Sequence, residues 1–422
     1  MNQADQPVQQ AQADHPAGSA PLSLRILQFV PEILPTFRAD VAALFGKYLP
    51  RHGVICDLVG QSSTNPGPQP GFGRVLRPTF SPSRIKRELD FIKVCVQALL
   101  SAKRRDYAAI QVRDMVGIGM LVLLGARLKG IPFIYWLSFT KCEVRIDRAR
   151  AGLRNGGGLR DRLLLIKGLV EHFFLYKVLL RQAEHVFVQS DAMLDLVAKE
   201  GIPRAKMTPV PMGVDMEVLA QRSAPRRLPG WEVGPVLAYL GTLDPMRQIT
   251  MVVDALVLIR QRYPSARLLL VGDAPVPSDV PVLLEYAAAA GVAEAVHVTG
   301  WLPPQQAWEL LAGADVAVSY FPRGVILDTA SPTKVLEYLA LGIPSLGNDN
   351  PDQQVVMQES QAGWLTPSTP AGLAEAACAV FADPGQAAQR AARGPAYIES
   401  RRSYRVLAEM VSARYASVLQ RR

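Results

Sequence analysis

The sequence predicts an α/β protein with two Rossmann-like, doubly wound domains that face a cleft, and a C-terminal helix that closes back on the first domain. Short apolar segments alternate with helical patterns in both halves of the chain, which is typical of parallel sheets covered on both faces. A Pro- and Arg-rich connector, about residues 219–234, separates the halves. A length of 422 residues also exceeds what one ordinary core accommodates.

The first domain is expected over residues 22–215. Its strands are expected at residues 25–30, 54–59, 108–112, 132–137, 183–189 and 207–210. Its main helices are expected at residues 38–50, 82–102 and 115–128. Residues 1–21 are rich in Gln, Ala and Pro and contain no Lys or Arg, so we expect a disordered tail and no secretion signal.

The second domain is expected over residues 216–395, followed by a crossing helix within residues 396–422. Its strands are expected at residues 236–240, 267–271, 296–298 and 316–319, each followed by a helix. Apolar residues at positions 249, 252, 253, 256 and 259 place one apolar stripe on the first of these helices. Residues 404–419 are amphipathic and suit the closing helix.

The positive charge belongs to the first half. The chain carries a net charge of +9, and residues 22–215 hold 29 Lys and Arg against 16 Asp and Glu. A basic face suits an anionic membrane, a phosphorylated lipid or a nucleic acid. We expect no nucleic-acid partner, because no helix-turn-helix, zinc finger or RNP-type motif is present. The longest apolar run, residues 115–126, is too short to span a bilayer.

The most basic segment runs from Arg145 to Lys167 and has Asn155–Gly158 in its middle. Several leucines and an isoleucine follow between Leu163 and Leu169. One interpretation is a hinge followed by an amphipathic helix that touches anionic lipid. The other is a solvated helix face beside a loop, and both stay open.

Cysteines and histidines give no sign of a metal or redox site. The four cysteines, at positions 56, 95, 142 and 378, form no CxxC motif and are expected to be buried free thiols, which favours the cytoplasm. The five histidines fall in no ligand spacing. Because no Asp-x-Asp motif is present, we expect no metal and no cofactor, and Arg and Lys side chains must neutralise any bound diphosphate.

The segment 331–349 predicts a loop, a short helix and a strand. Ser331 is expected as the N-cap, Pro332 as the first helical residue, and Gly342 ends the helix. A helix start with its free N–H groups suits a phosphate. Glu337 lies one turn further on, where a carboxylate reaches both hydroxyls of a ribose. The pattern predicts a nucleoside diphosphate held by the loop, Lys334 and Glu337.

Two strand-to-helix turns are further candidates. Gly241 permits a tight turn after its strand, and Arg247 is expected at a helix N-terminus, where anions bind. Gly300 could let a base approach the backbone beside Trp301. The alternatives are ordinary turns with a solvated arginine and a packed tryptophan. A P-loop is absent, and the Gly117–Gly119 segment lacks the rest of a dinucleotide fingerprint.

Several segments occur in the order and spacing of a known family. They are residues 185–190, 201–215, 241–247, 268–272, 298–300, 314–316 and 334–344. On these segments the chain resembles a family 4 glycosyltransferase of the GT-B fold, most strongly between Ala183 and Asp383. The resemblance implies that Glu337 holds the donor ribose and that Arg247 and Lys334 face the diphosphate.

The resemblance also implies a donor loop lined by the backbone of Pro332 and Thr333. Three positions depart from the family pattern: Thr329 stands where a second glutamate is frequent, with Asp328 beside it, Thr242 where a basic residue is frequent, and Ser138 where a histidine is frequent. These departures concern the sugar contacts more than the nucleotide site. The full set of expected donor-binding residues is Glu337, Gly241, Thr242, Gly300, Trp301, Ser331, Pro332 and Thr333, with Arg247 and Lys334 as the catalytic cations.

We therefore expect a retaining enzyme that moves a hexose from a UDP- or GDP-sugar to a hydroxyl of a saccharide or lipid-linked acceptor in bacterial surface polysaccharide synthesis. The expected location is the cytoplasm, at the inner face of the cytoplasmic membrane. Two alternatives remain. A sugar-nucleotide epimerase can share the two-domain fold, and a catalytically degenerate nucleotide-binding protein would fit the departures at Thr329, Thr242 and Ser138.

Overall fold

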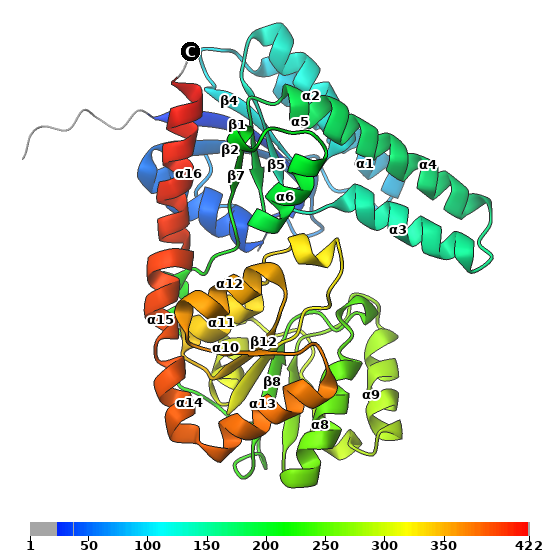
Figure 1. Cartoon of the computed structure of the whole chain (residues 1–422). Helices are drawn as coiled ribbons and strands as arrows, with labels where there is room; N and C mark the ends of the chain where they lie inside the picture. Colours follow the sequence, from blue (N-terminus) through cyan, green and yellow to red (C-terminus); the bar gives the residue numbers. More distant parts are fainter. Residues whose placement is uncertain (1–22, 37, 421–422) are drawn as a thin grey trace, which may run out of the picture.

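The computed structural model describes residues 23–36 and 38–420. Strands and helices alternate along both halves, and each half forms a sheet between layers of helices, one domain above the other (Figure 1). The two-domain doubly wound fold is thereby confirmed. The tail expected over residues 1–21 lies outside the described residues.

The first domain is built on a parallel seven-stranded sheet of order β3-β2-β1-β4-β5-β6-β7. The strands are β1 (Leu24–Leu34), β2 (Val54–Ser62), β3 (Val75–Leu76), β4 (Ala109–Arg113), β5 (Phe133–Leu137), β6 (His185–Val188) and β7 (Met207–Pro209). The helices are η1 (Asp40–Tyr48), η2 (Leu49–His52), α1 (Arg84–Ser101), α2 (Val116–Lys129), α3 (Lys141–Arg154), α4 (Leu159–Phe173), η3 (Phe174–Leu179), α5 (Leu180–Gln182), α6 (Asp191–Lys199) and η4 (Arg204–Lys206). The order turns back at β1 and β4, so the two directions of winding meet there.

The second domain is built on a parallel six-stranded sheet of order β10-β9-β8-β11-β12-β13. The strands are β8 (Val236–Leu240), β9 (Arg267–Val271), β10 (Val296–Val298), β11 (Val316–Ser319), β12 (Ser345–Asn348) and β13 (Trp364–Thr366). The helices are α7 (Met216–Leu219), η5 (Pro245–Arg247), α8 (Thr250–Arg262), α9 (Asp279–Ala289), η6 (Ala293–Ala295), α10 (Pro304–Ala312), η7 (Leu327–Thr329), α11 (Thr333–Leu341), α12 (Pro351–Ser360), α13 (Pro370–Ala382) and α14 (Pro384–Ala391). The expected apolar stripe of α8 is buried at every position, from Ile249 to Ile259.

The chain returns to the first domain through α15 (Gly394–Tyr397), η8 (Ile398–Arg402) and α16 (Tyr404–Leu419). Figure 1 shows α16 running along the side of the first domain. Its buried face packs in one cluster with Phe45 and Leu49 of the η1–η2 segment, and the Tyr415 hydroxyl donates a hydrogen bond to Gln111. The closing helix therefore lies where the amphipathic pattern predicts it.

Two hydroxyls tie the loops of the domains together. Ser190 Oγ donates a hydrogen bond to the Thr329 carbonyl at 2.7 Å, and Ser331 Oγ accepts one from the Met212 backbone N–H at 2.9 Å. On the far side of the cleft, Lys47 pairs with Asp215 at 2.8 Å. These contacts hold the carboxyl ends of the two sheets face to face.

All four cysteines are buried and unpaired, as expected. Across residues 23–36 and 38–420, no helix is both long enough and apolar enough to cross a membrane.

Candidate active-site cleft

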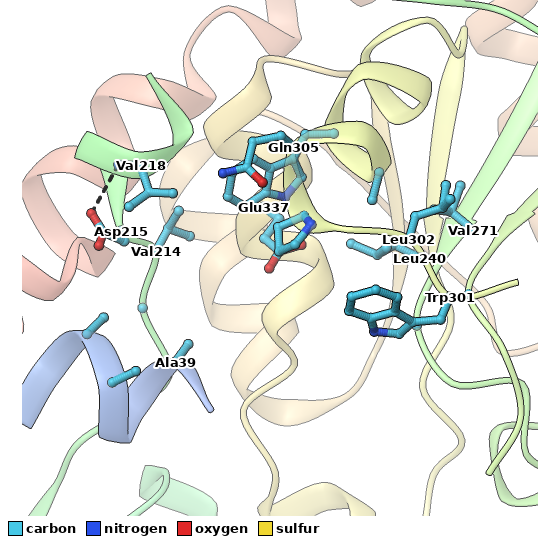
Figure 2. Close-up of a pocket in the computed structure, with 18 of the residues that line it drawn as sticks. Ala39, Val214, Asp215, Val218, Leu240, Val271, Trp301, Leu302, Gln305 and Glu337 are labelled. Atoms are coloured by element: carbon cyan, nitrogen blue, oxygen red, sulfur yellow. Dashed lines mark hydrogen bonds between the residues drawn. The ribbon is translucent and has the colours of Figure 1, made fainter. Parts of the chain in front are cut away.

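Two adjoining cavities of about 630 Å³ each lie between the domains, at the carboxyl ends of β8 and β9. This volume lies within the usual range for small-molecule sites. The first cavity is largely apolar and is shown in Figure 2, and the second contains most of the charged groups. Leu240, Gly241, Thr242 and Glu337 line both cavities, so one elongated ligand could occupy the two.

The β8 turn approaches the next strand so closely that side chains are excluded. Gly241 has φ of 139° and Gly272 has φ of 150°. A Cβ on Gly272 would lie 2.0 Å from the Gly241 carbonyl oxygen, so the two turns pack backbone to backbone. The predicted tight turn at Gly241 is present, and it brings the Thr242 backbone to the junction of the cavities.

Helix α11 starts differently from the sequence expectation. Its N-cap is Pro332 and its first helical residue is Thr333, so the predictions of Ser331 as N-cap and of Pro332 as the first helical residue were both wrong. The Ser331 hydroxyl instead donates to Asp352 at 2.6 Å and accepts from the Met212 N–H. The helix start still faces the second cavity, which Ser331, Pro332 and Thr333 line.

Lys334 is a buried cation at the floor of the second cavity. Its Nζ lies 2.9 Å from the Tyr239 hydroxyl and sits over the rings of Tyr239 and Phe321. Burial, followed by the nearby charge of Arg247, lowers the pKa of Lys334 to about 7. An anion bound here would remove that penalty and restore the full positive charge.

Arg247 lies at the end of η5, three residues before α8 begins. Its guanidinium stacks on Phe321 and makes a long contact of 3.7 Å with Asp244. Arg247 and Lys334 therefore share one aromatic platform and line one cavity, as the sequence predicts for a diphosphate site. Neither side chain makes a bidentate ion pair with a carboxylate, so both retain N–H groups that can donate hydrogen bonds to a bound anion.

Glu337 lies one helical turn after Lys334 and lines both cavities. Burial raises its pKa to about 7, while a hydrogen bond from Trp308 acts in the opposite direction. Trp301 projects at the mouth of the first cavity with 73% of its surface exposed (Figure 2). An exposed indole beside an apolar cavity offers a stacking surface for a flat ring.

Gly300 takes a different place from the other predicted residues. It forms a bridge with Gly272 and lines neither cavity, so it supports the turn from behind.

Thr329 is buried, and its hydroxyl donates to the Ile326 carbonyl at 2.6 Å. The neighbouring carboxylate of Asp328 accepts two hydrogen bonds from Arg323. Asp328 is thus held in an ion pair within its own loop.

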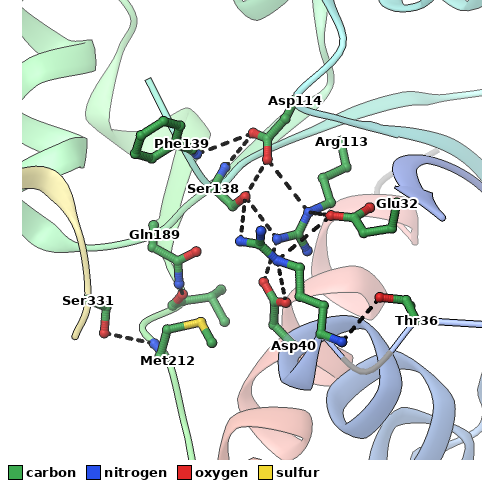
Figure 3. A network of polar contacts seen from close by, with 12 residues as sticks. Glu32, Thr36, Asp40, Arg113, Asp114, Ser138, Phe139, Gln189, Met212 and Ser331 are labelled. Atoms are coloured by element: carbon green, nitrogen blue, oxygen red, sulfur yellow. Dashed lines mark hydrogen bonds and ion pairs between the residues drawn. The ribbon is translucent and has the colours of Figure 1, made fainter. Parts of the chain in front are cut away.

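A polar network on the first domain forms the opposite wall of the second cavity (Figure 3). At its centre is Arg113, the last residue of β4, whose side chain is fully buried. Arg113 donates to Asp40 at 2.6 Å and to Ser138 Oγ at 2.9 Å. Asp114, with a left-handed φ of 49°, accepts from the Ser138 hydroxyl and from the Ser138 N–H at 2.7 Å. Ser138 therefore orders the network in the position where the family pattern has histidine.

The carboxyl groups of this network differ in their ionisation. Burial alone would raise the pKa of Asp40, but Arg113 and Arg38 outweigh it and hold the pKa below its usual value. The pKa of Glu32 is raised, mainly by burial, although the positive charge of Arg113 acts in the opposite direction. Its Oε2 is buried without a hydrogen-bond partner, and Glu32 lines the second cavity. Glu32 therefore lines the cavity with one carboxyl oxygen that makes no hydrogen bond within the protein.

The sequence expectations did not include this network. A signal was present, because Arg113 ends the buried strand β4 and Asp114 directly follows it, at the carboxyl edge of the sheet. Tyr239, which holds Lys334, lies within β8 and could not be distinguished from a core aromatic residue.

Family models match both halves of the chain. A model described as "Glycosyl transferase 4-like domain" matches residues 39–213, and one described as "Glycosyl transferases group 1" matches residues 234–383. Together the two models cover every strand of both sheets except β1, and every residue of the second cavity except Glu32 and Arg38.

Two curated proteins are similar over part of their length. A protein of Escherichia coli K12 named as a colanic acid biosynthesis glycosyltransferase is 23% identical over 197 residues, 46% of this chain and 47% of that protein. A GDP-mannose-dependent phosphatidylinositol monomannoside mannosyltransferase of Mycolicibacterium smegmatis is 29% identical over 223 residues, 50% of this chain and 58% of that protein. The chain thus spans about half the length of these relatives.

Solved structures share the fold across nearly the whole chain. HepE of Anabaena in complex with UDP-glucose superposes with a TM-score of 0.68 at 16% identity, covering 93% of this chain and 100% of that one. WaaG, a glycosyltransferase involved in lipopolysaccharide biosynthesis, has a TM-score of 0.64 at 14% identity, covering 92% and 99%. Sucrose-phosphate synthase of Thermosynechococcus elongatus has a TM-score of 0.66 at 16% identity, covering 94% and 100%.

Proposed function

The chain belongs to the family 4 glycosyltransferases of the GT-B fold, and from this premise we propose that it is a retaining hexosyltransferase that uses a UDP- or GDP-sugar. The acceptor we propose is a hydroxyl of a lipid-linked saccharide in bacterial surface polysaccharide synthesis. The single observation that carries the proposal is the pair of joined cavities with Glu337 at their junction and two cations beyond it.

The donor would lie across both cavities. The base occupies the apolar cavity against Trp301, and Glu337 accepts hydrogen bonds from the ribose hydroxyls. The diphosphate then reaches the start of α11, where Arg247 and Lys334 neutralise its charge. This order follows from the length of the ligand, because Glu337 and Lys334 are one helical turn apart.

Transfer breaks the bond between the anomeric carbon and the diphosphate oxygen, and the bonding electrons leave with the diphosphate. Positive charge develops on the sugar while negative charge develops on the leaving oxygen, which Lys334 and Arg247 stabilise. The acceptor hydroxyl forms the new bond from the face that the diphosphate leaves, and its proton passes to the departing phosphate oxygen. We assign the neutralisation to these two side chains and expect no metal.

The sugar and the acceptor hydroxyl would lie between the diphosphate and the first-domain network. We assign Glu32 to hydroxyl binding there, because Glu32 lines this cavity and one of its oxygens has no hydrogen-bond partner, whereas Asp328 is engaged by Arg323. Arg113 positions Glu32 and Asp40 without reaching the cavity itself.

The relatives support the choice of substrates. One is named for colanic acid biosynthesis, and the other for GDP-mannose and a phosphatidylinositol-linked acceptor. UDP and UDP-glucose occupy the structurally similar HepE. A lipid-linked acceptor places the enzyme in the cytoplasm, at the inner face of the membrane.

The proposal is tested by transfer from a panel of UDP- and GDP-sugars to a lipid-linked saccharide pool, with the anomeric configuration of the product read by NMR. Arg247→Ala and Lys334→Ala should each lower turnover by about 10²–10³-fold. Arg262→Ala, an exposed arginine of the same domain, is the matched control and should retain wild-type turnover.

Near-normal turnover in both cleft variants would contradict the assigned roles. Conversion of the nucleotide sugar to an isomer without any acceptor would indicate the epimerase. Binding without turnover on every acceptor would indicate the degenerate protein.

A further inference from the structure

Helices α3 and α4 form an antiparallel arm, residues 141–173, that projects away from the body of the first domain (Figure 1). The turn at Asn155–Gly158 joins the two helices at the tip of the arm. With 15 residues, α4 is about 22 Å long at 1.5 Å per residue. Gly168 is the one buried residue of α4, five of its residues are half-buried and the other nine are exposed, so one side of the helix is open to solvent.

The two helices hold each other by contacts that use the acidic side chains of the arm. Gly168 of α4 lies against Ile146 of α3, where an added Cβ would meet Ile146 at 2.8 Å. Glu171 pairs with Arg145, and Glu143 accepts a hydrogen bond from the Tyr176 hydroxyl. These carboxylates are therefore engaged within the arm and at its base.

An uninterrupted apolar stripe remains on the outer face of α4. Its five residues are between 48% and 72% exposed and follow one another at spacings of four and three, which places them on one side of a helix. They are Leu159 at 72%, Leu163 at 57%, Ile166 at 57%, Val170 at 48% and Phe173 at 56%.

Cations border this stripe. The arm, all of which is described, exposes seven Lys and Arg side chains and a single exposed acid, Asp147. The seven are Lys141, Arg148, Arg150, Arg154, Arg160, Arg162 and Lys167. Three of them, Arg148, Arg160 and Lys167, line a hollow next to Leu163, together with the single acid Asp161, so the hollow keeps an excess of positive charge.

The flanking charges decide between two occupants of the stripe. A second copy of the chain would bring Arg160, Arg162 and Lys167 against like charges, because these positions border the stripe on both sides. An anionic bilayer offers both an apolar interior for the stripe and negative headgroups for its borders.

We propose that the α3–α4 arm docks on an anionic phospholipid bilayer, with the stripe of α4 in the interface and its flanking cations on the headgroups. This surface lies outside the donor cleft and does not depend on the transferred sugar. The proposal rests on the proposed function in one respect: an enzyme with a lipid-linked acceptor has to work at a membrane surface.

The arm is continuous with the cleft. Its first residue, Lys141, lines the second cavity together with Ser138 and Phe139. A bilayer that holds the arm therefore also holds this side of the cleft close to the membrane surface. A lipid-linked acceptor could then reach the cavity while its lipid stays in the bilayer.

Flotation of the full chain with vesicles tests the proposal without any donor or turnover. The vesicles contain phosphatidylcholine alone or phosphatidylcholine with 30 mol% phosphatidylglycerol. We expect flotation with the anionic vesicles that weakens in high salt, because exposed charges are screened. Equal flotation with both vesicles, or none with either, would overturn the proposal.

Two variants of the arm separate its two contributions. Arg160→Gln/Arg162→Gln/Lys167→Gln should weaken binding to anionic vesicles by on the order of 100-fold, at about fivefold per charge. Leu163→Asn/Ile166→Asn should weaken it by about tenfold or more. The controls are Arg262→Gln/Arg393→Gln/Arg401→Gln and Leu258→Asn/Val282→Asn, which change exposed residues outside the arm and should bind as the wild type does.

Further measurements keep the outcomes distinct. Thermal stabilisation by a nucleotide should be the same in both arm variants as in the wild type, because the cleft is intact. If nucleotides do not stabilise the wild type, the donor site is contradicted, and flotation alone still decides whether the arm binds vesicles. Equal loss in the controls would overturn the assignment to the arm. A wild-type dimer that the stripe variant converts to a monomer, with no vesicle binding, would assign the stripe to self-association and overturn the proposal.

Discussion

Replacing Lys334 by Met should make the ligand-free protein more stable and the enzyme much slower. Lys334 is only 8% exposed, and its amine contacts the Tyr239 hydroxyl in a cavity that also contains Arg247. A methionine of similar length fills the same space without a charge that the fold must desolvate. The substitution therefore separates what the cation costs the fold from what it contributes to catalysis.

The magnitude follows from the pKa. Lowering the pKa of Lys334 from 10.5 to about 7 destabilises the protonated amine in the fold by on the order of 5 kcal/mol at most. In the unfolded chain the amine stays protonated up to pH 10.5, so the penalty is full below about pH 7. It shrinks as the pH rises and is absent above 10.5. The gain of Lys334→Met in free energy of unfolding should follow the same course.

Thermal melts between pH 6 and pH 9 and transfer kinetics test this prediction together. The melting temperature should rise by several degrees at pH 6 and by less at pH 9, while kcat/KM falls by about 10²–10³-fold. Lys206→Met is the matched control, because burial also lowers the pKa of Lys206 but this lysine lies outside the cleft. Turnover within threefold of wild type, or a lower melting temperature at pH 6, would refute the reasoning.

Three further predictions concern the same cleft. Affinity for a nucleotide sugar, measured by calorimetry, should peak near pH 7, because Glu337 becomes protonated at lower pH and Lys334 loses its proton at higher pH. Glu337→Gln should abolish the fall in affinity at low pH and keep the fall at high pH. Trp301→Ala should weaken nucleotide binding by about 10–100-fold through lost stacking, and a change under twofold would place the base elsewhere. Gly272→Ala should lower the free energy of unfolding by about 2 kcal/mol or more, because its Cβ would lie 2.0 Å from the Gly241 carbonyl oxygen; an unchanged urea midpoint would contradict this.

The sequence predicted the parts of the site that depend on local pattern. Gly241, Lys334 and Glu337 each occupy a position that a strand, a turn or a helix start defines within a few residues. The closing helix was also predictable, because the amphipathic pattern of residues 404–419 is confined to one segment.

The remainder depends on contacts between distant segments. The Ser331 hydroxyl could cap its own helix or bond elsewhere, and Asp352 and Met212 decided the outcome. The burial of Arg113 required Asp40, 73 residues away, to compensate its charge. No local pattern specifies such a pair, so the first-domain wall of the cleft was not predicted.

The measurement that tests the donor site most directly is thermal stabilisation by UDP, GDP, ADP and TDP, in the wild type and in Glu337→Ala. A nucleotide at 100 times its dissociation constant adds about 2.7 kcal/mol to the stability of the protein. We predict a clear shift with UDP or GDP that Glu337→Ala abolishes while its own melting temperature stays close to wild type. A shift of equal size in Glu337→Ala, or no shift with any nucleotide in the wild type, would contradict the assignment of this cleft to a nucleotide-sugar donor.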